Sequence, residues 1–107
     1  MHSLAVLRYC RDVLTERQQR DPWQGWFWGI RRKVLDYWIA RLEREDPGSA
    51  TIADLNVDER EAIRRSHPLL MSRTNATGSA IEIDRSWQAE LRDRVQRYLD
   101  AVKGHRS

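Results

Sequence analysis

The sequence has little of the residue types on which disulfide, metal and phosphate-loop chemistry depend. Its 107 residues include one cysteine, three histidines, five glycines and three prolines. A single cysteine cannot form an intramolecular disulfide, and no cysteine and histidine residues have metal-ligand spacing. Two of the glycines, Gly25 and Gly29, lie inside a predicted helix and not at a strand-to-helix turn, so they form no phosphate loop. We therefore expect a protein with no metal and no cofactor.

Long apolar runs are missing as well. No stretch approaches the roughly 20 apolar residues of a membrane-spanning helix. Arg8 and Arg11 interrupt the N-terminal segment where a secretion signal would need a continuous apolar core. We expect a cytoplasmic protein without a membrane span.

What the chain does contain suits one folded domain covering residues 1–107. Hydrophobic residues make up 40% and charged residues 33% of the sequence, and five residues are tryptophan. Each tryptophan can bury a large apolar surface, so a core can form at this length. The net charge of +3 is distributed along the chain, with no basic tail. The charge alone is therefore weak support for a nucleic-acid partner.

Apolar periodicity predicts an all-α fold of three long helices and one short helix. The first helix runs from Ser3 to about Arg20, and its apolar side carries Val6, Leu7, Cys10, Val13 and Leu14. The second runs from about Pro22 to Glu45, because Asp21-Pro22 is typical of a helix start. We expect the other helices to pack around this second one.

The short third helix begins after Asn56, which forms a capping box with Glu59, and ends at His67-Pro68. The last helix begins at Asp84 or Ser86 and continues to about Lys103, where Gly104 ends it. Its apolar stripe consists of Trp87, Leu91, Val95, Tyr98, Leu99 and Val102.

Residues 69–83 have two interpretations. The alternation around Ile81 and Ile83 fits the second strand of a minor β-hairpin before the last helix. Because an isolated two-stranded hairpin needs further packing to be stable, an irregular loop fits equally well.

The second helix has more apolar surface than a surface helix needs. Its aromatic and aliphatic residues cover an arc of roughly 220°, against the roughly 100° of an ordinary amphipathic helix. The remaining stripe carries Gly25, Gly29, Arg32, Asp36, Ala40 and Glu43. The helix is either central to the fold or half core and half interface, and its two glycines indicate close packing or a bent first turn.

Catalytic groups are few. His2 and His105 lie near the termini, and His67 lies at a helix end where its imidazolium could satisfy the last carbonyl groups. Cys10 lies on the apolar side of the first helix, which favours burial over reactivity. We therefore expect that the protein is not an enzyme.

The cluster Trp23, Trp26, Phe27 and Trp28, followed by Arg31, Arg32 and Lys33, is the most distinctive feature. Tryptophan and arginine are enriched in protein interfaces. We expect a non-enzymatic interaction module whose partner is another protein or a second copy of itself. The predicted contact surface comprises Trp23, Trp26, Trp28 and Arg31, together with Arg73 in the loop 73–79.

The alternative is a nucleic-acid-binding protein, because aromatic rings can stack on bases while cations hold phosphates. Its candidate residues are Arg31, Arg32, Lys33, Arg64, Arg65 and Arg73.

Overall fold

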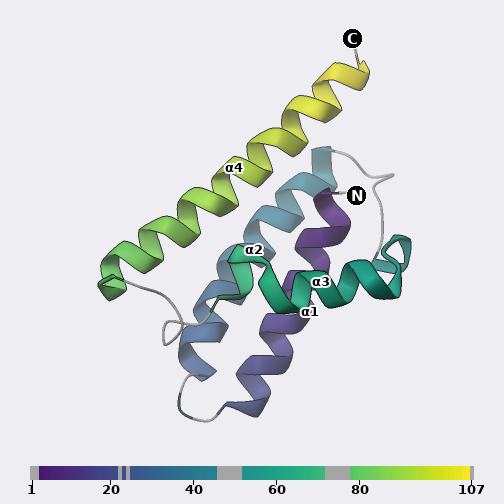
Figure 1. The fold of residues 1–107 in the computed structure, drawn as a ribbon. Coiled ribbons are helices and arrows are strands. Elements are labelled where there is room, and N and C mark those ends of the chain that lie inside the picture. The colour runs from purple at the N-terminus through teal and green to yellow at the C-terminus, as the bar shows by residue number, and fades with distance from the viewer. Residues whose placement is uncertain (1–2, 22, 24, 46–51, 72–77, 107) are drawn as a thin grey trace.

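Four α-helices and two short 3-10 turns make up the described part of the chain (Figure 1). The computed structural model describes residues 3–21, 23, 25–45, 52–71 and 78–106. In chain order the elements are α1 (Ser3–Arg20), α2 (Gly25–Glu45), η1 (Ile52–Asp54), α3 (Val57–Ser66), η2 (Pro68–Leu70) and α4 (Ala80–Arg106). The all-α prediction, with three long helices and one short one, is confirmed, and these residues include no strand.

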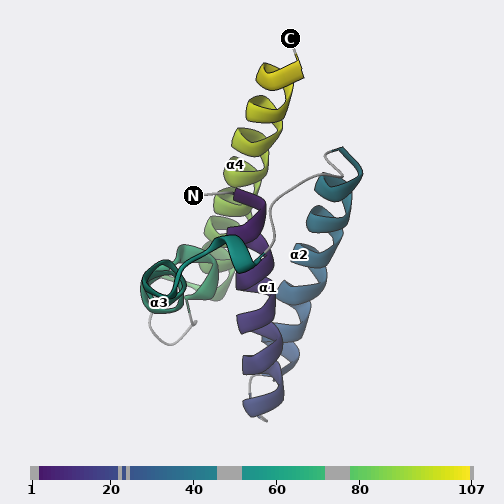
Figure 2. The ribbon, with the colours of Figure 1, turned by 90° about the vertical axis from the view of Figure 1, so that its right-hand side faces the viewer.

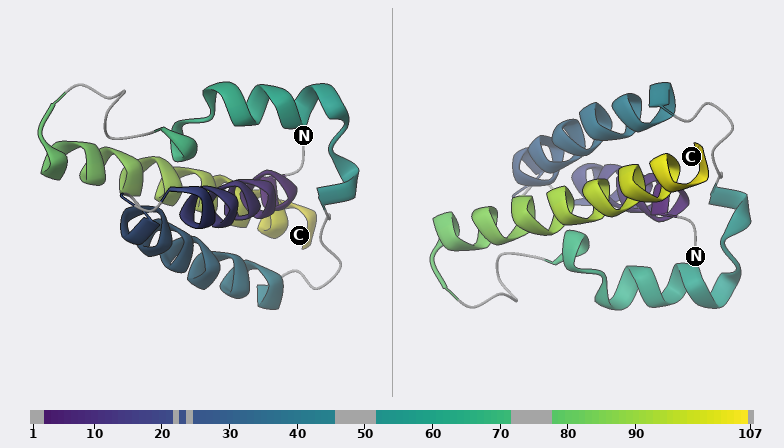
Figure 3. Two further views of the ribbon diagram at one scale, coloured as in Figure 1. Left: turned by 90° about the horizontal axis from the view of Figure 1, so that it is seen from below. Right: turned by 90° about the horizontal axis from the view of Figure 1, so that it is seen from above.

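The central helix is α1, and the prediction that the others pack around the second helix is wrong. Helix α1 contacts α2, α3, α4 and both 3-10 turns. Figure 2 shows it between α2 on one side and α3 on the other, and Figure 3 shows the same order from below. The predicted apolar side of α1 is buried as expected, and Leu4 and Ala5 extend it, so this helix buries side chains on a wider arc than its pattern indicated.

Helices α1 and α2 run antiparallel and pack closely (Figure 1). Part of the contact is made by the small and polar stripe of α2. A Cβ atom added at Gly25 would lie 3.1 Å from the backbone oxygen of Gln18, and one at Gly29 would lie 2.7 Å from its side-chain nitrogen. The close packing that the glycines indicated is therefore a contact within the chain.

Two ion pairs connect the same stripe of α2 to α1. Arg8 binds Glu43 at 2.9 Å, and Arg11 lies 3.6 Å from Asp36. Because α2 turns its small and polar stripe toward the edge of α1, much of its aromatic surface is directed elsewhere.

The start of α2 differs slightly from the prediction. The helix begins at Gly25, whereas Pro22 lies outside the described residues. The Asp21 carboxylate accepts a hydrogen bond from the backbone N–H of Trp23 at 3.0 Å. Asp21 therefore stabilises the turn that leads into the helix, which is the role expected of a polar residue at a helix start.

Helix α3 has the predicted bounds and the predicted capping box. The Asn56 side chain accepts from the N–H of Glu59 at 2.8 Å, and the Glu59 carboxylate accepts from the N–H of Asn56 at 3.1 Å. His67 is the C-terminal cap, and Pro68 begins η2. Ile63 is buried, which attaches this short helix to the core.

Helix α4 is longer at both ends than predicted, and the hairpin is not formed. Ser79 and Glu82 make a second capping box: each side chain accepts the backbone N–H of the other at 3.2 Å. Ile81 and Ile83 therefore lie in the first turn of α4, not in a strand. Gly104 does not end the helix, which continues to Arg106. The pattern Ser-x-x-Glu was present in the sequence and would have located this start.

A single set of buried apolar side chains connects the helices. It comprises Leu4, Ala5, Val6, Leu7, Cys10, Val13 and Leu14 of α1, Phe27, Trp28, Leu35, Ile39 and Leu42 of α2, Leu55, Ile63, Leu69 and Leu70, and Trp87, Leu91 and Val95 of α4. Burial raises the pKa of the Cys10 thiol to about 12, as expected for a core cysteine. None of the described helices is apolar enough over a sufficient length to cross a membrane.

The capping box of α3 gives a first test. Replacing Asn56 with Ala removes the acceptor for the Glu59 N–H, and we expect the free energy of unfolding to fall by about 1 kcal/mol. Urea denaturation followed by circular dichroism measures this change. Asn56→Ser retains an acceptor and should be close to wild type; equal losses for both variants would contradict the capping role.

Candidate functional site

An aromatic stripe lies exposed along one face of α2 and in the turn before it. We use this name for Trp23, Trp26, Ile30 and Tyr37, which are large hydrophobic residues with most of their surface accessible. Trp26 is 62% exposed and Tyr37 is 59% exposed. On a helix with 100° per residue, Trp26, Ile30 and Tyr37 lie on one line, and Trp23 lies in the turn before the helix. Trp23 and Trp26 are therefore placed on the surface where the sequence suggested a contact.

A groove runs beside the aromatic stripe, between α2 and the first turns of α4. It has a volume of about 250 Å³. Its lining residues are Trp26, Phe27, Ile30, Arg31 and Val34 of α2 and Asp84, Trp87 and Gln88 of α4. The stripe is therefore one wall of a depression with a mostly apolar lining, and not a set of isolated side chains.

The same face of α2 carries positive charge. Lys33, Arg41 and Arg44 are exposed, and helical spacing places them on or beside the line of the aromatic stripe. The Arg41 guanidinium lies 5.6 Å from the centre of the half-buried Trp38 ring, a cation–π contact. Glu45, at the end of the helix, is the exposed acid of α2. The face therefore combines aromatic groups with flanking cations.

Two of the predicted contact residues are buried, contrary to the sequence interpretation. Trp28 and Arg31 are each 4% exposed. Trp28 lies about 200° around the helix from Trp26 and packs into the core, and Arg31 lies under α4. These residues hold the fold together and are not available to a partner. Arg73 lies outside the described residues.

Arg31 is the buried charge that joins three segments. It donates to the backbone carbonyl of Met71 at 2.9 Å and lies 3.5 Å from the Asp84 carboxylate. Its guanidinium also lies 4.3 Å from the centre of the Phe27 ring and 5.1 Å from the centre of the Trp87 ring. A charge can remain buried when it is paired and hydrogen-bonded, which is the case here.

We predict that Arg31→Ala lowers the free energy of unfolding by about 3 kcal/mol, because it empties the space between two rings and leaves the Met71 carbonyl group without its donor. Arg31→Met fills the space without the charge and should lie between Arg31→Ala and wild type. Guanidinium unfolding measures both variants, and Lys33→Ala on the exposed face is the matched control. A loss for Lys33→Ala as large as for Arg31→Ala would contradict the assignment.

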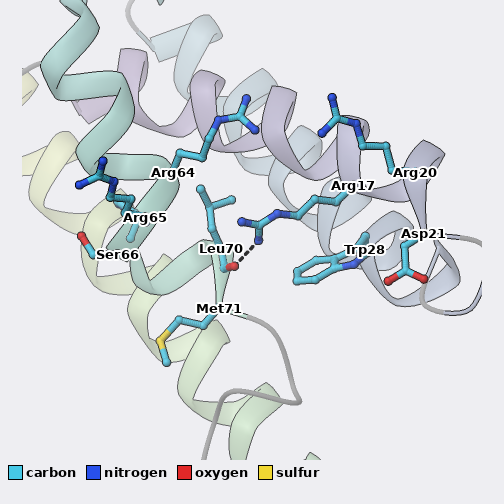
Figure 4. A pocket seen from close by; sticks show the side chains of 10 residues that line it. Arg17, Arg20, Asp21, Trp28, Arg64, Arg65, Ser66, Leu70 and Met71 are labelled. Carbon is cyan, nitrogen blue, oxygen red and sulfur yellow. Dashed lines mark hydrogen bonds between the residues drawn. The ribbon is translucent and has the colours of Figure 1, made fainter.

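The five candidate nucleic-acid residues that the structure describes do not form one surface. Arg31 is buried, and Arg32 lies 3.8 Å from Asp36 in an ion pair. Lys33 is exposed beside the aromatic stripe. Arg64 and Arg65 lie on α3, where they line a pocket together with arginines of α1 (Figure 4). The basic cluster that the structure does assemble therefore includes Arg17 and Arg20, which the sequence interpretation missed.

His67 has a different role from the one predicted. Its Nδ1 atom accepts a hydrogen bond from the N–H of Leu69 at 3.2 Å, so the ring caps η2 in its neutral form and does not donate as an imidazolium. Burial, followed by the charge of Arg94, lowers its pKa to about 4. The ring is 8% exposed.

This pKa predicts acid sensitivity. The folded-state pKa of about 4 lies below the ordinary value of 6.5, so the unfolded chain binds a proton in that range more readily than the folded chain. The contribution is fully present above pH 6.5, and up to about 3 kcal/mol is lost as the pH falls toward the folded-state value. His67→Asn retains an acceptor for the Leu69 N–H but does not titrate. Urea unfolding at several pH values should show a shallower decline for this variant; identical slopes would rule out His67 as the source.

Comparison of the chain with protein-family models, with curated proteins and with solved structures gives no match. Within the described part of the chain, no three histidine, cysteine, aspartate or glutamate side chains form a group that could hold a metal ion. The aromatic stripe and the arginine cluster are therefore the two features of the described residues that indicate a function.

Proposed function

We propose that this protein is a non-enzymatic interaction module that docks on a helix of a partner protein through the aromatic stripe of α2. The observation that carries the proposal is the exposure of two tryptophans: Trp26 lies on a face of α2, whose other sides pack against α1 and α4, and Trp23 lies in the turn before this helix.

The fold leaves the apolar area of the aromatic stripe in water. Burying a large aromatic side chain is among the strongest contributions available to an interface. Trp26 and Ile30 also line the groove beside α4, so an apolar side chain of a partner could pack between the two helices. An amphipathic helix laid along such a groove is a common mode of recognition.

The charge of the face specifies the chemistry of the partner. Lys33, Arg41 and Arg44 accompany the aromatic stripe, so the complementary helix has apolar residues flanked by aspartate or glutamate. A second copy of this chain fits less well. A symmetric antiparallel pair of α2 helices centred on the stripe would bring Lys33 of one copy close to Lys33 of the other, and like charges in contact are unfavourable.

Two synthetic helical peptides test the proposal. Both carry the same leucine stripe, and one has glutamate flanks whereas the other has lysine flanks. We expect the glutamate peptide to bind and to shift tryptophan emission to shorter wavelength, because Trp23 and Trp26 leave water. Trp26→Gln should weaken binding by about tenfold or more, as expected for an interface hot spot, and should change stability by less than about 0.5 kcal/mol.

Val57→Gln is the matched control, because Val57 is an exposed apolar residue on α3. It should bind the glutamate peptide like wild type. Equal binding of both peptides would contradict the claim that the partner helix carries acidic flanks. Sedimentation showing dimers that Trp26→Gln dissociates would replace the partner with a second copy, and a monomer that binds neither peptide would overturn the docking role.

A further inference from the structure

A second surface, separate from the aromatic stripe, has the properties of a ligand site. It is a pocket of about 680 Å³ between the end of α1, the end of α3 and η2. We call it the arginine pocket; its lining residues are Arg17, Arg20, Asp21, Trp28, Arg64, Arg65, Ser66, His67, Leu70 and Met71. Its volume falls within the range of roughly 300–1,000 Å³ that is common for small-molecule sites.

Four guanidinium groups are brought to this pocket from two helices. Their carboxylate partners are fewer: Glu16 binds both Arg20 and Arg64, and Glu61 binds Arg65. Asp21 is the acid of the lining. Positive charge is therefore in excess around the pocket.

Arg17 is the arginine of the pocket whose charge is least neutralised, because no carboxylate of the described residues forms an ion pair with it. Its NH1 donates to the Leu70 carbonyl, and its guanidinium lies 5.1 Å from the centre of the Trp28 ring. Figure 4 shows the group between Leu70 and the indole, inside the pocket. Burial lowers the pKa of Arg17, and the nearby charge of Arg64 lowers it further. The negative charge of an anion bound here would stabilise the charged guanidinium and so oppose both effects.

His67 supplies an independent observation that points to a ligand. Its Nδ1 atom accepts the Leu69 N–H, so the proton of the neutral ring is on Nε2. That Nε2 atom is buried and has no hydrogen-bond partner among the residues that the structure describes. Buried donors are normally satisfied, because an unsatisfied one is costly. A lining residue that is more than nine-tenths buried thus holds a donor that no described residue uses.

We propose that the arginine pocket binds the phosphate group of a small phosphorylated molecule. Arg17 is the principal anchor, and Arg64 and Arg20 add positive charge at the rim. Nε2 of His67, which is buried behind the lining, becomes the neutral donor when the ligand displaces the groups that cover it. Trp28, Leu70 and Met71 form an apolar wall for the organic part of the ligand. Planar guanidinium groups match the geometry of phosphate oxygens. A pocket of about 680 Å³ has the size of a small-molecule site, so we assign the phosphate group to a small molecule and not to the continuous backbone of a nucleic acid.

The test uses the full chain with four probes: inorganic phosphate, pyrophosphate, adenosine monophosphate and a short single-stranded oligonucleotide. We expect the mononucleotide to bind saturably in calorimetry and to raise the Tm. Arg17→Gln should weaken this binding at least about tenfold, because it removes charged hydrogen bonds. Arg92→Gln on the exposed face of α4 changes the net charge equally and should bind like wild type.

Arg17 also donates to the Leu70 carbonyl, so Arg17→Gln could weaken the fold as well as the binding. Arg64→Gln is a second variant, because the Arg64 side chain is more exposed. It should weaken binding while its Tm without ligand stays close to that of wild type. Nitrogen chemical shifts of the His67 ring give a direct readout, because Nε2 should change on binding and Nδ1 should not.

Three outcomes would overturn the proposal. The first is no heat and no Tm change with any probe at low salt. The second is equal weakening by Arg17→Gln and Arg92→Gln, which would indicate general charge attraction. The third is tighter binding of the oligonucleotide than of the mononucleotide with a steep dependence on salt, which would identify a nucleic acid as the source of the phosphate.

Discussion

The arrangement of α2, α4 and the segment around Met71 depends on the contacts of one buried group, the guanidinium of Arg31. A charge with 4% exposure must find its partners inside the protein, and here they are the Met71 carbonyl and the Asp84 carboxylate. The rings of Phe27 and Trp87 enclose it. Because these partners lie on different segments, satisfying the charge fixes how α4 crosses α2.

The same contact fixes the rotation of α2 about its own axis. With Arg31 directed at α4, and with Gly25, Gly29 and Asp36 directed at α1, the face carrying Trp26 and Tyr37 has no helix left to cover it. The exposed aromatic stripe is thus a consequence of how the polar and small residues of α2 are satisfied.

Local patterns in the sequence were sufficient to predict the bounds of most of the helices. The bounds of α1, the capping box at Asn56 and the stop at His67-Pro68 follow from interactions within a few residues, so they could be predicted. The first turn of α4 could not be predicted from apolar alternation, since Ile81 and Ile83 fit a strand as well as a helix. The decisive local feature there was the pairing of Ser79 with Glu82.

The candidate sites depended on contacts that no local pattern contains. The sequence identified an excess of apolar surface on the second helix, and two of its tryptophans are indeed exposed, but helical periodicity could not distinguish Trp26 from Trp28 without knowing which side α1 covers. Arg17 and Arg64 are 47 positions apart in the chain, and only the packing of α3 on α1 brings them to one pocket.

The burial of Cys10 has a practical consequence. A thiol that stays protonated in the middle of the central helix is closed to alkylating reagents and oxidants as long as the core is intact. The rate at which a reagent labels Cys10 therefore reports how often the core opens, and this measurement does not depend on any tryptophan signal.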